Sequence, residues 1–333
     1  MADSKDNHLD ESRPVPGVPF RTSLYPAIRP TQYTDSDFKD KVVLITGSGR
    51  GIGRALGLAF CSIGARVCFT DLTPDAAAEA AREARETYPA TVVTSIEADM
   101  RDYSSLERLH DHVVATLGEV DILINNAGWG DFTTFDVTRP EDTWDTITVN
   151  LKGPLDITRL CLPAMIKRKT GVIICNTTTG AVDNYPFCIP YMLAKTAQGK
   201  FMHCLQMELT ETDIQCFHVH PGCPKTSMGD PETAMRPYVR ELRPTLWKWV
   251  EGYLPSLDED MELAVWSMVF LASGKAAALK GRYINANHDI GEVLKRADAV
   301  ISGNMYTLKA DTFDVVKEQP QAADFYRQNK YLK

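Results

Sequence analysis

The sequence has few of the features that direct a protein to a membrane or to nucleic acid. No uninterrupted apolar stretch approaches the roughly 20 residues that span a bilayer. Residues 1–8 lack the apolar core of a secretory signal, so we expect no export signal here. The formal net charge of −8 argues against nucleic acid or an anionic membrane surface as the main partner. We therefore expect a small-molecule substrate as the principal partner.

The eight cysteines lack the spacing of a metal site or a redox motif. They contain no Cys-x-x-Cys pair and no spacing typical of zinc. Several lie in apolar runs such as 172–175, which favours reduced thiols in the core. We therefore expect no metal and a cytoplasmic location.

What is present is an alternation of strand and helix patterns over one large domain. Residues 1–38 are polar and rich in proline, which indicates an arm or a disordered lead and not a packed domain. From residue 39 to 290, repeated βα units predict an α/β fold: a doubly wound, Rossmann-like parallel sheet in a single domain. The expected strands are 42–46, 66–70, 91–98, 120–124, 172–175, 214–220 and 281–285, and the expected helices are 54–63, 76–87, 104–117, 144–168, 261–273 and one that carries residue 191.

Two segments stand outside this alternation. Residues 224–260 combine several prolines with Trp, Tyr and Met, and follow a strand end where a pocket opens, so we interpret them as a substrate-loop insertion. A packing role for Trp247 and Trp249 in the core or at a subunit contact is an equal alternative. Residues 291–333 are interpreted as a C-terminal extension.

A glycine-rich loop joins the first strand to the first helix. Its residues, 46–53, read Thr-Gly-Ser-Gly-Arg-Gly-Ile-Gly, and glycines there let the backbone approach a pyrophosphate at a helix N-terminus. Asp71 ends the second strand, where an acid binds the adenosine ribose and repels a 2′-phosphate. Arg50 could pair with that phosphate instead. We weigh the acid more heavily, so NAD is favoured and NADP stays possible.

Tyr191 and Lys195 are four residues apart, on one face of a predicted helix. A neighbouring ammonium favours the phenolate, so we expect a lowered tyrosine pKa and a proton donor usable near neutral pH. The same spacing also occurs where a packed ring lies beside a solvated lysine. The glycine loop and the Asn125–Asn126 pair at a strand end favour the catalytic interpretation.

Together these residues resemble the short-chain dehydrogenase/reductase family over about residues 40–290. The resemblance implies a catalytic set of Asn150, Thr178, Tyr191 and Lys195. It also implies the nicotinamide cofactor as ligand and a homodimer or homotetramer. The predicted helices 144–168 and 191–210 carry apolar residues beyond one face, including Phe201, Met202, Leu205 and Met207, which we expect to pack against the partner. The cofactor-binding residues that we expect are Gly47, Ser48, Arg50, Gly51, Ile52, Gly53, Asp71, Asp99, Met100, Asn126, Ala127, Gly128, Tyr191, Lys195, Pro221, Gly222, Pro224 and Thr226. The arm and tail resemble fungal members from secondary metabolism.

One position departs from the family pattern, which has a serine near thirteen residues before the tyrosine. Thr178 lies at that distance, and Thr179 is the alternative. A threonine keeps the hydroxyl that can donate to a substrate oxygen, but its methyl crowds the pocket. High β-propensity at a strand end is a structural alternative for these threonines.

The function expected from these features is hydride transfer between a nicotinamide cofactor and a carbonyl or alcohol of an apolar, possibly aromatic, small molecule. Two alternatives stay open. One is a redox-neutral enzyme on the same scaffold, such as a dehydratase, epimerase or cyclase, and the other is a non-catalytic cofactor-binding protein.

Overall fold

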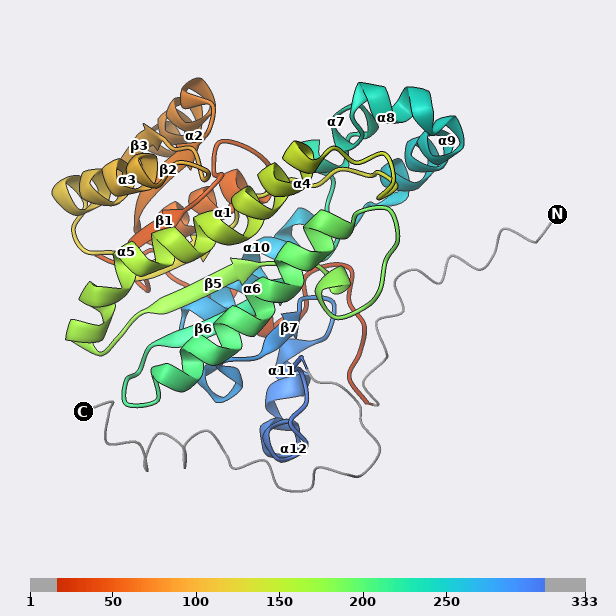
Figure 1. Ribbon diagram of the computed structural model, residues 1–333. Helices are drawn as coiled ribbons and strands as arrows, with labels where there is room; N and C mark the ends of the chain where they lie inside the picture. Colours follow the sequence, from red (N-terminus) through yellow and green to blue (C-terminus); the bar gives the residue numbers. More distant parts are fainter. Residues whose placement is uncertain (1–16, 309–333) are drawn as a thin grey trace, which may run out of the picture.

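A seven-stranded sheet, parallel throughout, forms the centre of the molecule (Figure 1). The computed structural model describes residues 17–308. The strand order is β3-β2-β1-β4-β5-β6-β7, so it reverses direction between β1 and β4 and leaves a crevice at the carboxyl ends there. The predicted doubly wound fold is confirmed. The strands are β1 Val42–Ile45, β2 Arg66–Asp71, β3 Val93–Glu97, β4 Ile122–Asn125, β5 Val172–Asn176, β6 Gln215–His220 and β7 Tyr283–Asn285.

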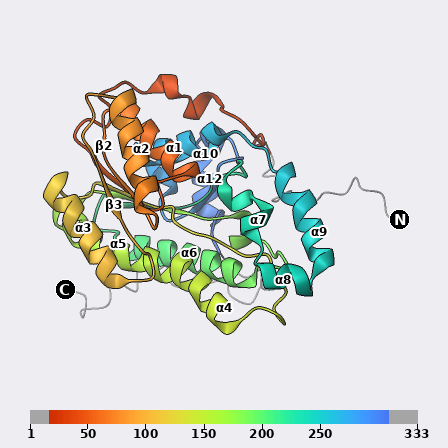
Figure 2. The same ribbon diagram turned by 90° about the horizontal axis from the view of Figure 1, so that it is seen from above.

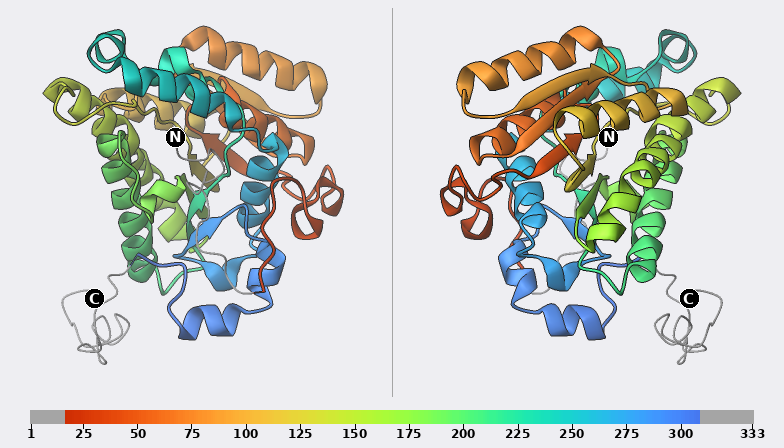
Figure 3. Two further views of the ribbon diagram at one scale, coloured as in Figure 1. Left: turned by 90° about the vertical axis from the view of Figure 1, so that its right-hand side faces the viewer. Right: turned by 90° about the vertical axis from the view of Figure 1, so that its left-hand side faces the viewer.

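Helices cover both faces of the sheet, which Figure 3 shows between two helix layers. Alternate residues of β1 serve the two layers: Val43 and Ile45 belong to one apolar cluster, Val42 and Leu44 to the other. No helix within residues 17–308 is both long and apolar enough to cross a membrane. The first layer contains α1 Gly51–Ser62, α2 Pro74–Thr87 and α10 Met261–Ala272, and the second contains α3 Tyr103–Thr116, α5 Gly153–Arg168 and α6 Ile189–Glu208.

Of the four residues on α6 predicted to pack against a partner, Met202 and Leu205 lie in the core, while Phe201 and Met207 are half-buried. Met202 is fully buried and Leu205 is 6% exposed, and both pack in the second cluster. The prediction that these two side chains face a second subunit is therefore wrong. They lie on the side of α6 that packs on the sheet, which apolar character alone does not distinguish from an outer face.

The helix predicted over 144–168 is interrupted. It consists of α4 Pro140–Ile147, a π-helical turn Thr148–Lys152, and α5. Pro154 has no N–H, so the usual α-helical bond to the carbonyl of Asn150 is absent at this point. Such wide turns occur frequently at functional sites. Here the turn carries Asn150, whose side chain is fully buried.

The proline-rich arm packs on the domain wherever the structure describes it. Over 17–38, Tyr25 and Ile28 are buried in the first cluster. The Tyr25 hydroxyl donates to the carbonyl of His288 at 3.3 Å and accepts from the amide of Ile290 at 3.3 Å. Of the two predicted alternatives, the described stretch is therefore an arm anchored on the domain and not a disordered lead. Residues 1–16 lie outside the described residues.

The C-terminal extension also packs, up to residue 308. It contains the short helices α11 Ile290–Leu294 and α12 Ala297–Ser302. Val293 and Val300 are buried in the first cluster, and the amide of Tyr283 in β7 donates to the carbonyl of Tyr306 at 2.9 Å. The rest of the predicted extension, 309–333, lies outside the described residues.

The predicted insertion forms three short helices with a small core of their own, which we call the lid (residues 224–260). They are α7 Pro231–Ala234, α8 Pro237–Leu242 and α9 Pro244–Tyr253, each with proline at its first position. Figure 2 shows them grouped at one side of the molecule, near α4. The core of the lid consists of Ala234, Met235, Val239, Leu246, Val250 and Leu254.

Candidate active site

One cavity of about 1240 Å³ lies at the carboxyl ends of the strands, at the crevice where the strand order reverses. Its walls come from the glycine loop, the ends of β2, β4, β5 and β6, the start of α6, and the lid. Most of the predicted site residues line it. Ser48, Gly53 and Asn150 do not, and lie behind the wall.

The glycine loop has the backbone geometry of a phosphate-binding turn. Gly47 has a φ of +64°, a left-handed conformation that disfavours any side chain. A Cβ at Gly53 would lie 2.3 Å from the carbonyl oxygen of Gly47, so this helix start tolerates only glycine. The Ser48 hydroxyl is fully buried and donates to the carbonyl of Ile45 at 2.8 Å. Ser48 and Gly53 therefore shape the loop from behind, while Gly47, Arg50, Gly51 and Ile52 face the cavity.

Asp71 presents a fixed carboxylate at one end of the cavity. It is 7% exposed, and its two oxygens accept from the amides of Gly49 at 3.3 Å and Thr73 at 3.1 Å. A carboxylate has about four acceptor positions, so two remain for ligand hydroxyls. Arg50 lies exposed on the same cavity wall. The turn-forming role and the ligand-binding role of Asp71 are thus compatible.

Asp99 and Met100 line the same end. The Asp99 carboxylate accepts from Arg101 Nε at 3.0 Å and Nη2 at 2.8 Å, and these bonds lower the pKa of Asp99. Arg101 also lines the cavity, and sequence reasoning missed it. The only signal was an arginine two residues after an acid, which by itself is too common to be informative.

Asn126 joins the end of β4 to the glycine loop. Its side-chain amide donates to the carbonyls of Thr46 at 2.9 Å and Gly47 at 3.0 Å. Its oxygen accepts from the Asn176 side chain at 3.0 Å. Asn126 therefore sets the distance between two strand ends, and the adjoining Ala127 and Gly128 line the cavity.

Residues 221–226 complete the wall opposite the glycine loop. Gly222 has a φ of +84°, and Pro221, Gly222, Pro224 and Thr226 line the cavity. A Cβ on Gly51 would lie 3.4 Å from Thr226 Cγ2, so this segment reaches over the loop. The backbone amide of Cys223 donates to the Glu259 carboxylate at 2.7 Å, which ties the segment to the end of the lid.

Tyr191 and Lys195 lie in the first two turns of α6, and both reach the cavity. Lys195 Nζ is 5.5 Å from the centre of the Tyr191 ring and donates to the carbonyl of Asn176 at 2.7 Å. Burial raises the pKa of Tyr191 above its ordinary value and lowers the pKa of Lys195 to about 8. The predicted lowering of the tyrosine pKa is therefore wrong for the protein alone, because burial is the largest effect on Tyr191 and raises its pKa.

Asn150 lies beside this pair. Its side-chain amide donates to the carbonyls of Trp129 at 2.6 Å and Thr146 at 2.9 Å, while its Oδ1 has no hydrogen-bond partner within residues 17–308. A Cβ on Gly128 would lie 2.5 Å from that oxygen and 3.5 Å from Lys195 Nζ. The free acceptor and the ammonium thus converge on one point, an arrangement that suits a bridging water.

All three threonines after β5 line the cavity, at 177, 178 and 179. Thr178 is half-buried, and its hydroxyl accepts from the amide of Gly180 at 3.3 Å. Thr179 is 7% exposed. Both alternatives for the serine position therefore lie at the site.

Four aromatic rings form a continuous wall, which we call the aromatic wall. Trp249 stacks on Tyr253 with 4.7 Å between ring centres, and Phe132 and Phe187 meet Trp249 edge-on at 5.8 and 6.1 Å. All four line the cavity. Trp247 instead packs against the core of the lid. Trp249 therefore lies on the cavity, and Trp247 has the packing role. Phe132 and Phe187 were not predicted from the sequence, because they lie in other loops.

Comparison with known proteins identifies the family. The family model for short chain dehydrogenases matches residues 41–237. The short chain dehydrogenase pigC of Monascus ruber is 31% identical over 299 residues, covering 87% of this chain and 92% of that protein. A short chain dehydrogenase of Pseudocercospora fijiensis is 30% identical over 293 residues, covering 84% and 91%. The fungal resemblance is confirmed.

Solved structures agree with this assignment. A short chain dehydrogenase from Mycobacterium paratuberculosis bound to NAD has a TM-score of 0.66 and 26% identity, covering 75% of this chain and 97% of that one. Levodione reductase has a TM-score of 0.66 at 22% identity, covering 74% and 96%, and supports the fold alone. Because the family model matches more than half of the residues, this chain belongs to the short-chain dehydrogenase family of oxidoreductases.

Proposed function

We propose that this protein transfers a hydride between NAD and the carbonyl or alcohol of a flat, apolar small molecule. The observation that carries the proposal is the position of Tyr191, on the cavity that the glycine loop and the aromatic wall share. A dinucleotide fits the part of the cavity beside the glycine loop, which contains the left-handed Gly47, a helix N-terminus and the Asp71 carboxylate. When bound, the nicotinamide supplies the redox chemistry.

The residues of this chain supply proton transfer and positioning. The Tyr191 phenol can donate its proton to a carbonyl oxygen that gains negative charge, and the nearby Lys195 ammonium would stabilise the phenolate that remains. Lys195 places its ammonium beside the Tyr191 ring. Asn150 would hold the water through which Lys195 exchanges protons. Thr178 donates a second hydrogen bond to the substrate oxygen.

The aromatic wall is the basis for the substrate class. Four rings along one side of the cavity favour a flat apolar molecule. Offset and edge-on contacts between rings strengthen binding beyond what burial of apolar surface provides. The test is NADH oxidation with isatin, a flat aromatic molecule with a ketone next to a lactam carbonyl, compared with diacetyl, a small aliphatic diketone. We expect a higher kcat/KM for isatin.

Trp249 should account for much of that preference. We expect Trp249→Leu to raise the KM for isatin by about tenfold and to leave the KM for diacetyl nearly unchanged, because only the larger ring reaches the wall. Trp247→Leu is the matched control, since Trp247 packs inside the lid and does not line the cavity. Equal effects of both changes on isatin would refute the wall as the substrate contact.

The threonine that replaces the family serine can be identified by the loss of its hydroxyl. We expect Thr178→Val to lower kcat by about 10- to 100-fold, because one donor to the substrate oxygen is lost while the side-chain shape is kept. Thr178→Ser should restore the rate. A loss confined to Thr179→Val would assign the role to Thr179.

The two alternative functions correspond to distinct outcomes of the isatin and diacetyl assays. Binding of NADH without oxidation of it by any carbonyl would favour a redox-neutral enzyme or a cofactor-binding protein. A product formed with no net change in NADH would identify a redox-neutral enzyme, and the absence of any product would favour a cofactor-binding protein.

A further inference from the structure

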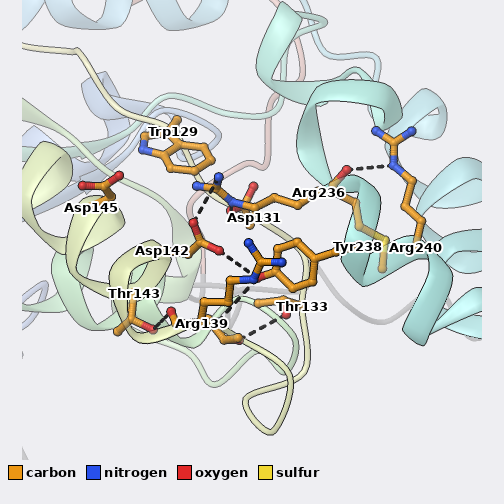
Figure 4. Close-up of polar contacts among 12 residues, drawn as sticks. Trp129, Asp131, Thr133, Arg139, Asp142, Thr143, Asp145, Arg236, Tyr238 and Arg240 are labelled. Atoms are coloured by element: carbon orange, nitrogen blue, oxygen red, sulfur yellow. Dashed lines mark hydrogen bonds and ion pairs between the residues drawn. The ribbon is translucent and has the colours of Figure 1, made fainter.

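A buried ion-pair cluster joins the lid to the loop that follows β4, residues 128–134 (Figure 4). Its centre is Arg236, the residue just before α8. Arg236 Nε donates to Asp131 at 2.6 Å, and Nη1 lies 3.1 Å from a carboxylate oxygen of Asp142 in α4. The Asp131 and Asp142 side chains are only 8% and 12% exposed, while Arg236 is 30% exposed, so solvent screens these ion pairs only in part.

Three further contacts span the same gap. The Arg236 guanidinium lies over the ring of Trp129, 4.5 Å from its centre. The Tyr238 hydroxyl donates to Asp142 at 2.8 Å. The amide of Phe132 donates to the carbonyl of Ala234 at 2.8 Å. A guanidinium that is bonded at two nitrogens and stacked on a ring has one geometry, which fixes Trp129 against the lid.

The other side of the same loop touches the catalytic groups. The carbonyl of Trp129 accepts from the Asn150 side chain at 2.6 Å. A Cβ on Gly130 would lie 2.9 Å from the ring of Tyr191, so backbone and ring are in direct contact. A shift of this loop therefore moves both Asn150 and Tyr191. The chain of contacts runs from Arg236 through Trp129 to Asn150.

We propose that Arg236 is a positioning residue for the reaction: by clamping Trp129 and Asp131 to the lid, it holds the loop that aligns Asn150 and Tyr191. This inference rests on the proposed function. A lid arginine that served only stability would have no effect on the hydride step.

Loss of Arg236 leaves two poorly hydrated carboxylates near each other. Burial raises the pKa of Asp131, and the bond from Arg236 opposes that rise. Without the guanidinium, the two carboxylates repel or share a proton, and in both cases the contact that holds the loop to the lid is lost, so we expect the loop to move. A lysine cannot bond both acids and stack on Trp129 in the same way, so Arg236→Lys should be only partly active.

The test compares Arg236→Met with Arg240→Met. Arg240 is the matched control because it also stacks on a tryptophan, Trp247 at 4.4 Å, and donates to the carbonyl of Met235, but these contacts stay within the lid. Turnover is measured with isatin and NADH, and again with NADH deuterated at the transferred position. We expect Arg236→Met to lower kcat by about 10- to 100-fold, with a larger isotope effect and a KM for NADH within about twofold of wild type. Arg240→Met should keep kcat within about twofold.

Amide hydrogen exchange gives a readout that does not depend on activity. Exchange over 128–134 should be about tenfold faster in Arg236→Met and nearly unchanged in Arg240→Met. Equal kcat losses in both variants, or an unchanged kcat and exchange rate in Arg236→Met, would overturn the proposal. If the wild-type protein does not reduce isatin, that result counts against the proposed function. The comparison of exchange rates still tests whether Arg236 holds the loop 128–134 in place. If Arg236→Met does not fold, Arg236→Lys is measured in the same way.

Discussion

Replacing Tyr191 by phenylalanine is expected to lower kcat for carbonyl reduction by about 1000-fold or more, since the group that protonates the substrate oxygen is lost. The ring itself stays, with its contacts to Gly130 and to Lys195. We therefore expect the Kd for NADH to change by less than about threefold. Stopped-flow measurement of NADH oxidation, with a separate titration of NADH fluorescence, would distinguish the two effects.

The matched control is Tyr103→Phe, which removes a hydroxyl from a tyrosine on α3 that is 37% exposed and does not line the cavity. That variant should keep the wild-type rate. Full turnover by Tyr191→Phe would remove Tyr191 from the mechanism and with it the acid–base part of the proposed function.

Cofactor preference should reverse when the charge at Asp71 is removed. At an effective dielectric constant of about 20, two unit charges roughly 6 Å apart interact by about 3 kcal/mol, or about 100-fold in affinity. Asp71→Asn removes the charge and keeps one acceptor oxygen, which can serve only one of the two amides, Gly49 or Thr73, that bond to the separate oxygens of Asp71. We expect the NADPH-to-NADH ratio of kcat/KM to rise by about 100-fold, because Arg50 is then the only one of the two charges left to meet a 2′-phosphate.

Two measurements support that interpretation. Arg50→Gln in the Asp71→Asn background should lower the affinity for NADPH and leave NADH unaffected, because only NADPH carries the phosphate that Arg50 would pair with. Equal Kd values for NADH and NADPH in the wild-type protein would contradict the argument from Asp71.

Much of the fold could be predicted because its signals are local. Apolar runs with strand length, helix-forming stretches such as 76–87 and the glycines at 47, 51 and 53 each depend on neighbouring residues. Burial on both sheet faces makes the parallel strands read as continuous apolar runs, which the sequence displays at 172–175. The only local signal for the π-helical turn at Asn150 was the missing donor at Pro154, and a second proline in the same pattern, Pro163, leaves α5 uninterrupted.

The candidate site was predicted in part for the same reason. Thr178, Tyr191 and Lys195 line the cavity, and the roles that we propose for them come from residue type and spacing. The protonation state could not be predicted in this way, because the pKa of Tyr191 depends on how deeply its hydroxyl is buried. Burial is a property of the assembled site, to which residues more than 60 positions away contribute, such as Trp129 and Tyr253.

By itself, then, the sequence determined the βα order, the glycine loop with Asp71 and the Tyr191–Lys195 pair, since each is set by spacing along the chain. Only the tertiary structure decided which tryptophan faces the cavity, which way the tyrosine pKa shifts and that Arg236 connects the lid to Trp129. Those outcomes depend on contacts between segments about 100 residues apart, such as Arg236 with Asp131, whose geometry no local pattern records.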